Sequence, residues 1–326
     1  MLELVLRRAE PNPFAAHWLP QLELGGVRVQ VCPLYAAEEP DPRAAALAQV
    51  EVFERAVREN GDRVVHVRTR RDLEVVLDGD RLGLVLSLEG LEALEGDPAR
   101  FEEWWERGVR MASLTWNHRN AFAGGLDTPE EGLTTAGRDV VARMTELGAI
   151  VDLAHASLKT FDEVLGLVGR DALLCVSHAG CCAVNDHPRN VDDERLRALA
   201  ERGGVLGVMA LTLAVGRPGG NLERLLDHFD HAVRVMGSEH VGLGSDFIDQ
   251  VVQAELTAGE ELEEATREAL EIGGGMLGIP ELTGPGDYPL LVEGLRGRGY
   301  DGESLDALLS ANWLRLLRRA LPDYAA

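Results

Sequence analysis

Four side chains of the types that bind divalent metals each follow directly on an apolar, strand-like run. Histidine and carboxylate groups are the usual ligands of zinc and similar ions. The four residues, with the runs that precede them, are Glu89 (82–88), His155 (149–154), His178 (172–177) and Asp246 (240–245). Because the carboxyl ends of parallel strands hold the active site in α/β folds, we expect these side chains to converge on one metal site.

Taken singly, each of these residues has an ordinary structural explanation. A lone histidine at a strand end is more often a hydrogen-bonded structural residue. Glu89 or Asp246 alone could merely cap the helix that follows it. Four such residues at four strand ends that face one point are much harder to attribute to coincidence, so the pattern indicates a divalent-metal site.

The elements that must position these residues follow a repeated pattern of helix, glycine and short apolar run. Glycine commonly follows a helix end, and Ser157, Asp192 and Asn221 are good N-cap residues for the helices that start after them. Continuous apolar runs that alternate with helices predict parallel strands buried on both faces. The predicted strands are 27–35, 82–88, 109–115, 149–154, 172–177, 205–210 and 240–245, and the C-terminal segment 303–320 is predicted to be an amphipathic helix.

Seven strand–helix units without a second domain leave the architecture open between two forms. Closed parallel barrels have eight strands. The chain is therefore either an open doubly wound sheet or a barrel that lacks one strand. In both cases residues 1–326 are expected to form one α/β domain.

Composition excludes several classes of partner. The net charge of −23 argues against nucleic acid and against an anionic membrane surface. No apolar run reaches the roughly 18 residues that a membrane span needs. Four cysteines among 326 residues are not a disulfide framework. We expect a cytoplasmic protein with no nucleic-acid or membrane partner.

A series of motifs, in order and spacing, resembles the membrane (renal) dipeptidase family, peptidase family M19. The resemblance extends from Gly25 to the C-terminal helix, and bacterial members of this family are generally soluble. The motifs are Leu-Ser-Leu-Glu-Gly (86–90), Gly-Val-Arg-Met-Ala-Ser-Leu-Thr-Trp-Asn (108–117), Gly-Leu-Thr-Thr-Ala-Gly-Arg (132–138), Val-Asp-Leu-Ala-His-Ala-Ser (151–157), Ser-His-Ala-Gly (177–180), His-Pro-Arg-Asn-Val (187–191), Gly-Leu-Gly-Ser-Asp-Phe (242–247) and Asn-Trp-Leu-Arg-Leu-Leu (312–317).

The resemblance implies a TIM (β/α)8 barrel of the metal-dependent hydrolase type with a binuclear zinc centre that cleaves dipeptides. Glu89 matches the carboxylate that bridges the two metals, and His155 and His178 match ligands of the second metal. Asp246 matches the family's proton-handling aspartate, and Arg189 matches the arginine that binds the substrate carboxylate. A hydroxide that bridges the metals would attack the peptide carbonyl.

Two departures from the family pattern stand out. Family members begin with a strand that ends in a His-x-Asp pair, which binds the first metal, and no such pair lies near Met1. This gap coincides with the missing eighth strand. We expect the natural protein to start upstream of Met1. The rival explanation is a genuine loss that leaves a one-metal or inactive relative.

The second departure is Trp116, which stands where animal members carry a histidine that polarises the substrate carbonyl. Either the metals act alone there or His118 substitutes. If the strand continues past residue 115, the side chain two residues on points to the same side. His118 is therefore a candidate substrate-binding residue.

The leading interpretation is a zinc dipeptidase with two metal ions per chain, or one if the first site is absent. It would act on small dipeptides and form a homodimer by analogy with the family. A different barrel hydrolase acting on a lactone, an amide or a D-amino-acid dipeptide is the enzymatic alternative. A non-catalytic binding protein with a degraded metal site is the third possibility.

Overall fold

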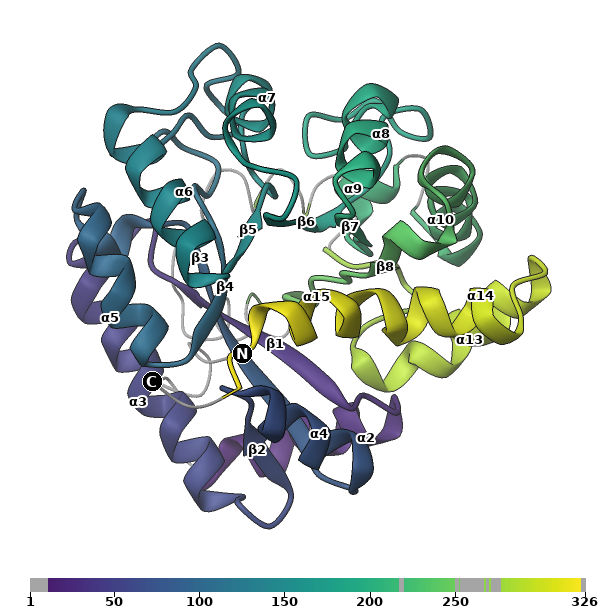
Figure 1. Ribbon diagram of the computed structural model, residues 1–326. Helices are drawn as coiled ribbons and strands as arrows, with labels where there is room; N and C mark the ends of the chain where they lie inside the picture. The colour runs from purple at the N-terminus through teal and green to yellow at the C-terminus, as the bar shows by residue number, and fades with distance from the viewer. Residues whose placement is uncertain are drawn as a thin grey trace.

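A curled parallel sheet surrounded by helices forms the body of the molecule in a computed structural model (Figure 1). The structure describes residues 11–216, 220–249 and 277–323, with the single positions 252, 267 and 270. The strands are β1 (Val29–Tyr35), β2 (Val64–His66), β3 (Leu82–Glu89), β4 (Val109–Ser113), β5 (Ile150–Asp152), β6 (Leu173–Ala179), β7 (Val205–Val208) and β8 (Val241–Leu243).

The seven strands that the sequence predicts are all present and run in the order β1-β3-β4-β5-β6-β7-β8, every ladder being parallel. The three-residue strand β2 was not predicted, and it pairs with the start of β3 beside this path. In the described part of the chain, β1 and β8 are the two ends of the path and do not pair. Within the described residues the architecture is thus a parallel half-barrel of seven strands, and these residues do not close it into a full eight-stranded barrel. Residues 1–10, where the missing pair was sought, lie outside the described residues.

Several helices begin where a polar side chain accepts one of the first free backbone N–H groups, among them α3, α4 and α6. The three predicted N-caps are confirmed: Ser157, Asp192 and Asn221 each accept a hydrogen bond from the backbone N–H three residues on. The helices are α2 (Leu19–Leu24), α3 (Pro42–Glu59), α4 (Arg70–Asp78), α5 (Phe101–Glu106), α6 (Thr135–Leu147), α7 (Leu158–Leu167), α8 (Asp193–Glu201), α9 (Thr212–Val215), α10 (Leu222–Met236), α13 (Tyr288–Gly297), α14 (Gly302–Asp306) and α15 (Asn312–Ala320). Short 3₁₀ or π turns are η1 (Phe14–Trp18), η2 (Glu92–Leu94), η3 (Pro98–Arg100), η4 (Ser238–His240), η5 (Pro285–Asp287) and η6 (Ala307–Ala311).

The predicted C-terminal helix is present as α14, η6 and α15, and α15 lies across the amino-terminal ends of the strands. Leu316 and Leu317 of this helix join a buried hydrophobic cluster with Val85 of β3 and Met111 of β4. The indole of Trp313 donates a hydrogen bond to the carbonyl of Leu243 in β8 at 3.0 Å. This helix therefore seals one end of the half-barrel, which leaves the carboxyl ends of the strands for the site.

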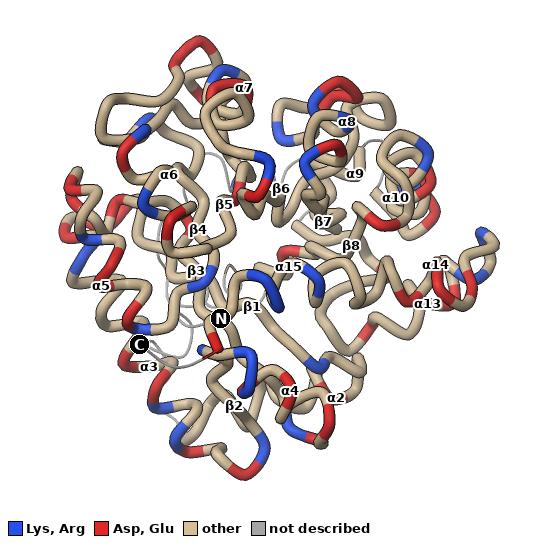
Figure 2. The backbone as a smooth tube through the Cα atoms, in the orientation of Figure 1, with Lys and Arg blue, Asp and Glu red and all other residues tan. Residues whose placement is uncertain are grey.

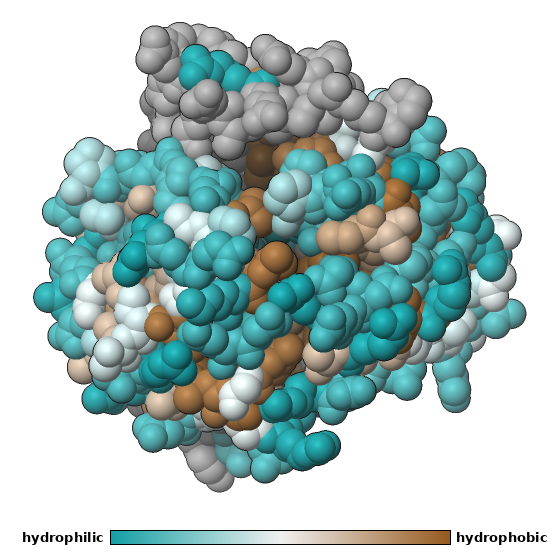
Figure 3. Space-filling model, turned by 90° about the horizontal axis from the view of Figure 1, so that it is seen from above, coloured by the Kyte–Doolittle hydropathy of each residue, from teal (hydrophilic) through white to brown (hydrophobic). Residues whose placement is uncertain are grey.

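Charged residues lie mainly on the helices and loops around the sheet (Figure 2). On the face seen from above, hydrophilic residues cover most of the surface and apolar residues form a band between them (Figure 3). The charged outer surface fits helices that pack one apolar face on the sheet. Among the described helices, none has the combined length and hydropathy needed to cross a membrane.

Candidate metal centre

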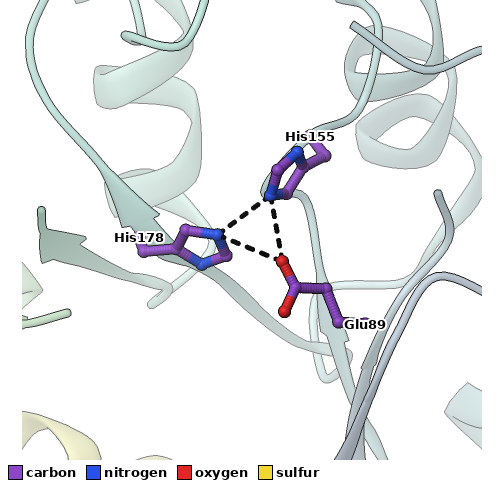
Figure 4. A group of neighbouring side chains, drawn as sticks. All are labelled: Glu89, His155 and His178. Carbon is purple, nitrogen blue, oxygen red and sulfur yellow. Dashed lines mark hydrogen bonds and ion pairs between the residues drawn. The ribbon is translucent and has the colours of Figure 1, made fainter. Parts of the chain in front are cut away.

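Glu89, His155 and His178 converge at the carboxyl ends of β3, β5 and β6 (Figure 4). The Nε2 atoms of the two histidines lie 3.0 Å apart. Glu89 Oε1 lies 3.1 Å from Nε2 of His155 and 3.6 Å from Nε2 of His178. No other group of three histidine, cysteine or carboxylate donors comes this close within the described residues.

The donor set fits a divalent metal ion. Zinc bonds of about 2.0–2.1 Å at the tetrahedral angle place neighbouring donor atoms about 3.3 Å apart. The three observed separations, 3.0, 3.1 and 3.6 Å, bracket that value. Two imidazoles and one carboxylate are also the ligands of several single-zinc hydrolases, which keep a fourth position for water or substrate.

Both histidines have a hydrogen-bond partner on the far ring nitrogen. Asn117 Oδ1 lies 2.7 Å from Nδ1 of His155 and accepts a hydrogen bond from it, so Nε2 presents a lone pair to the site. The Ser177 hydroxyl lies 2.7 Å from Nδ1 of His178 and can do the same. These contacts hold the rings in the orientation that a metal ligand requires.

The backbone is strained at two of the predicted positions. His155 and Asp246 have φ angles of +63° and +58°, in the left-handed region that residues other than glycine seldom adopt. Such strain persists only where surrounding contacts fix it, and it concentrates at functional sites. Here it occurs in the short segments that follow β5 and β8, and both side chains lie at the common centre.

Arg189 reaches the group from the loop that follows β6. Its side chain is buried, and Nη2 lies 3.0 Å from Nε2 of His155. The loop is fixed at its base, because Asn190 Oδ1 accepts from Gly180 N and the buried His228 accepts from Cys181 N. The arginine is therefore held at the metal-binding group by a preformed loop.

A continuous cavity of 1480 Å³ contains the three donors, Arg189 and Asp246. Tyr35 and Trp116 line it on the side of β1 and β4. On the side of β7 it is lined by apolar residues that include Met209, Leu211 and Leu277. The volume is ample for a ligand of dipeptide size.

Mutual contacts set the charge states in this group. Burial alone would raise the pKa of Glu89, but its close contacts with the imidazoles of His155 and His178 hold that pKa well below the usual range. Burial, reinforced by the Arg189 cation, lowers the pKa of His155 to about 3. Burial also acts to lower the pKa of His178, yet the pKa is raised because Asp246 and Glu89 carry negative charge beside it. The centre thus combines an ionised carboxylate with a neutral imidazole at position 155.

Asp246 lies beside the three donors but is not one of them. Its Oδ2 is 4.0 Å from Nε2 of His178. Burial raises the pKa of the Asp246 carboxyl, and the nearby Glu89 carboxylate acts in the same direction. A carboxyl group with a raised pKa is suited to accept and return a proton.

His118 is not brought into the group. The sequence argument needed the strand to continue to residue 118, and this premise is wrong because β4 ends at Ser113. The imidazole is 63% exposed, with Nε2 3.2 Å from Glu38 and Nδ1 2.7 Å from Asp127. Trp116 contacts the rings of both His118 and His155, so it lies between the two histidines.

Three residues at the site were missed at the level of sequence: Asn117, Asp152 and Ser177. Asp152 and Ser177 fall inside runs that are otherwise apolar and buried. A polar residue in a buried parallel strand needs a hydrogen-bond partner. That requirement is the signal that could have found two of them, whereas Asn117 lies in a loop and gives no comparable signal.

Comparisons with known proteins found a matching family profile and several relatives. The family profile described as membrane dipeptidase (peptidase family M19) matches residues 16–270. Dipeptidase verJ of Clonostachys rogersoniana is 28% identical over 276 residues, which cover 84% of this chain and 64% of that enzyme. An uncharacterised protein from the pqqA 5′ region of Klebsiella pneumoniae is 29% identical over 290 residues, covering 85% of this chain and 97% of that protein.

Two solved structures share the fold. A metallopeptidase called dipeptidase AC, of family M19, superposes with a TM-score of 0.84 at 24% identity and covers 100% of this chain and 97% of its own. A Rhodobacter sphaeroides metallopeptidase, solved with a phosphinate mimic of L-Ala-D-Ala, has a TM-score of 0.78 at 24% identity and covers 93% of this chain and 89% of its own. At this identity the likeness concerns the fold.

Proposed function

Since the chain belongs to the membrane dipeptidase family, peptidase family M19, we propose that it is a metal-dependent dipeptidase. The observation that carries this proposal is the convergence of three metal-binding donors and one buried arginine in a single cavity. The donors would hold the metal, and the guanidinium would bind the free carboxylate of a dipeptide. A planar guanidinium suits that task because it can donate two parallel hydrogen bonds.

Glu89, His155 and His178 would be the ligands, and zinc is the ion we expect. When bound, the metal supplies a Lewis acid that polarises the peptide carbonyl and makes water a better nucleophile near neutral pH. Three donors gathered in the described part of the chain predict one ion at this position. A second ion, as in the binuclear centre expected from the resemblance, would need ligands beyond these three.

The remaining side chains orient the substrate and move protons. Arg189, buried beside His155, would fix the carboxylate end of the dipeptide and so place the peptide bond next to the donors. Asp246 would take a proton from the attacking water and deliver it to the leaving amine. Its raised pKa and its position 4.0 Å from His178 support this role.

The test is hydrolysis of a dipeptide panel by the purified chain after zinc loading, with zinc per chain measured on the same sample. The panel contains L,L and L,D dipeptides, their N-acetyl forms and their C-terminal amides. We expect cleavage of free dipeptides, loss of activity in a chelator and a much weaker reaction with the amides. A zinc-loaded protein that cleaves none of the dipeptides would overturn the proposal.

A matched pair of variants distinguishes loss of the metal centre from a general loss of folding or activity. Glu89→Gln removes the charged donor at nearly constant volume and should abolish both zinc binding and hydrolysis. Glu103→Gln alters an exposed glutamate that pairs with Arg43 on the outer surface, and should change neither. Equal loss in both variants would contradict the assignment.

A further inference from the structure

The carboxylate of Asp152 links the two strands that carry the histidines. Asp152 is the last residue of β5, and its side chain is buried. Its Oδ1 atom accepts two backbone hydrogen bonds, from Ala154 N at 3.0 Å and from Ser177 N at 2.8 Å. One oxygen atom thus holds the residue before His155 and the residue before His178.

This link stands where the backbone pairing of the sheet ends. The register between β5 and β6 ends at Asp152 and Cys175, and the last backbone bond runs from Leu153 N to Cys175 O. On its other side, β6 pairs with β7 through an irregularity between Val176 and Ala179. His155 and His178 therefore lie beyond or beside the regular ladder, where backbone pairing does not fix their separation.

The side chain of Asp152 takes over the function of the missing ladder bond. The bond to Ala154 N closes a tight turn immediately before His155, whose φ is +63°. The bond to Ser177 N fixes the backbone of the residue whose hydroxyl contacts Nδ1 of His178. A strained conformation needs such external support to persist.

We propose that Asp152 is a positioning residue that sets the separation of His155 and His178 and thereby the affinity of the centre for a divalent metal. In this role it acts through the backbone, by way of the two N–H groups from which its Oδ1 atom accepts. The inference rests on the metal centre of the proposed function and adds the residue that spaces two of its ligands. The 3.0 Å between the two Nε2 atoms is the quantity that Asp152 maintains.

A rival explanation is purely electrostatic. The charge of Asp152 also acts on the buried Arg189, which stands beside His155. Replacing aspartate by asparagine separates the two effects. Asparagine keeps an oxygen acceptor for the two N–H groups and removes the charge.

The experiment measures zinc affinity by competition with a chromophoric chelator, which needs no turnover. Partners that orient metal ligands typically contribute 10- to 100-fold in affinity. We expect Asp152→Ala to weaken zinc binding by at least about 10-fold, and Asp152→Asn to stay within about threefold of the wild type. The visible spectrum of the cobalt-loaded protein should change in Asp152→Ala and not in Asp152→Asn, because it reports the ligand geometry.

Asp72→Ala is the matched control. Asp72 Oδ2 also accepts two backbone N–H groups, from Arg68 at 3.1 Å and Thr69 at 2.8 Å, but it does so at the start of α4, away from the centre. The Asp72→Ala substitution should lower the thermal stability of the protein without changing its zinc affinity or its cobalt spectrum. If Asp152→Ala does not fold, Asp152→Glu replaces it, since one added methylene displaces the acceptor and should likewise weaken zinc binding at least about 10-fold.

Three results would overturn the inference. Wild-type zinc affinity in a folded Asp152→Ala or Asp152→Glu would show that Asp152 does not space the ligands. Equal losses in Asp152→Asn and Asp152→Ala would assign the effect to charge. If the wild-type chain binds no zinc, the proposed metal centre is itself wrong. That failure of the proposed function is distinguishable from a failure of the inference about Asp152, because it is seen in the wild type before any variant is compared.

Discussion

Nη2 of Arg189 lies 3.0 Å from Nε2 of His155, the same ring nitrogen that faces Glu89 Oε1 at 3.1 Å. A guanidinium has only N–H donors, so the imidazole must accept at Nε2 and carry its proton on Nδ1, toward Asn117. The arrangement places a permanent cation beside a metal ligand. Such a cation competes with a metal for the lone pair, yet it is correctly placed to bind an anionic substrate group.

Replacing Arg189 by methionine should therefore affect substrate and metal in different ways. We expect KM for a free dipeptide to rise about 100-fold, since a charge-assisted bidentate contact is lost. Zinc affinity should not fall, because a repelling charge has been removed. Steady-state kinetics and chelator competition on the same preparation test both statements.

Arg195→Met is the control for Arg189. Arg195 pairs with Asp162 and Asp192 at the start of α8, outside the cavity. The Arg195→Met variant should keep the wild-type KM and zinc affinity. An unchanged KM in Arg189→Met would remove the arginine from substrate binding.

Asn117 should influence the metal through the proton of His155. Asn117→Leu removes the acceptor at Nδ1, so the ring can rotate or change tautomer. We expect zinc affinity to fall 10- to 100-fold, and Asn117→Asp, which retains an acceptor, to restore most of it. Titration against a chelator measures this. If the leucine variant binds zinc normally, the hydrogen bond does not orient the ligand.

How much was predictable from sequence depends on what positions each residue. Glu89, His155 and His178 follow strands whose apolar runs were recognisable, so the topology alone brings them to one edge. The separations of their donor atoms, however, depend on left-handed backbone at His155 and on side-chain contacts from Asn117. Those contacts join segments 38 residues apart along the chain, and strand and helix patterns do not encode them.

Two features of the structure differ from the sequence predictions for similar physical reasons: the additional strand β2 and the end of β4 before His118. β2 has only three residues, too few to form a recognisable apolar run, and it is stabilised by pairing with β3. His118 was placed by assuming that its strand continued, whereas the chain leaves the sheet after Ser113. The Ser113 hydroxyl accepts from Gly90 N and donates to Thr115 O at this point. A side-chain bond of this kind ends a strand without any change in apolar pattern.

Asp246 should matter for turnover and not for metal binding. Asp246→Asn keeps the volume but cannot accept a proton, so we expect kcat to fall by at least about 100-fold. Because Asp246 Oδ2 is 4.0 Å from the nearest histidine nitrogen of the centre, zinc affinity should change less than about threefold. Pre-steady-state rates with zinc content measured in parallel will show which quantity changes. A large loss of zinc would make Asp246 a ligand.

His118 should be nearly dispensable for catalysis. It is exposed and interacts with Glu38 and Asp127, with Trp116 between it and the centre. We expect His118→Asn to change kcat by less than about threefold, because exposed ion pairs contribute little. Loss of two orders of magnitude in kcat, with KM unchanged, would instead place His118 at the substrate carbonyl.

Acid should destabilise the fold partly through His228, on α10. Its ring is buried, accepts from Cys181 N and lies 3.1 Å from the Val215 carbonyl, to which it donates from Nε2. Burial lowers the pKa of His228 from 6.5 to about 4, and the Arg224 cation adds to this, while Asp227 opposes it. Between these two values the unfolded chain binds more protons than the folded chain.

Stability should therefore fall as the pH drops from 6.5 toward 4, and His228 should contribute about 3 kcal/mol of that fall. His66, whose pKa burial also lowers to about 4, adds a similar component. His228→Gln disturbs the hydrogen bonds of the imidazole with Cys181 N and the Val215 carbonyl, so this variant should be less stable than the wild type at pH 7. Because glutamine cannot be protonated, the variant should lose less stability on acidification. Urea unfolding from pH 7 to pH 4 measures the difference between the two curves. Parallel curves would mean that His228 keeps its ordinary pKa in the folded protein, and the loop that carries Arg189 would then not be anchored by a neutral imidazole.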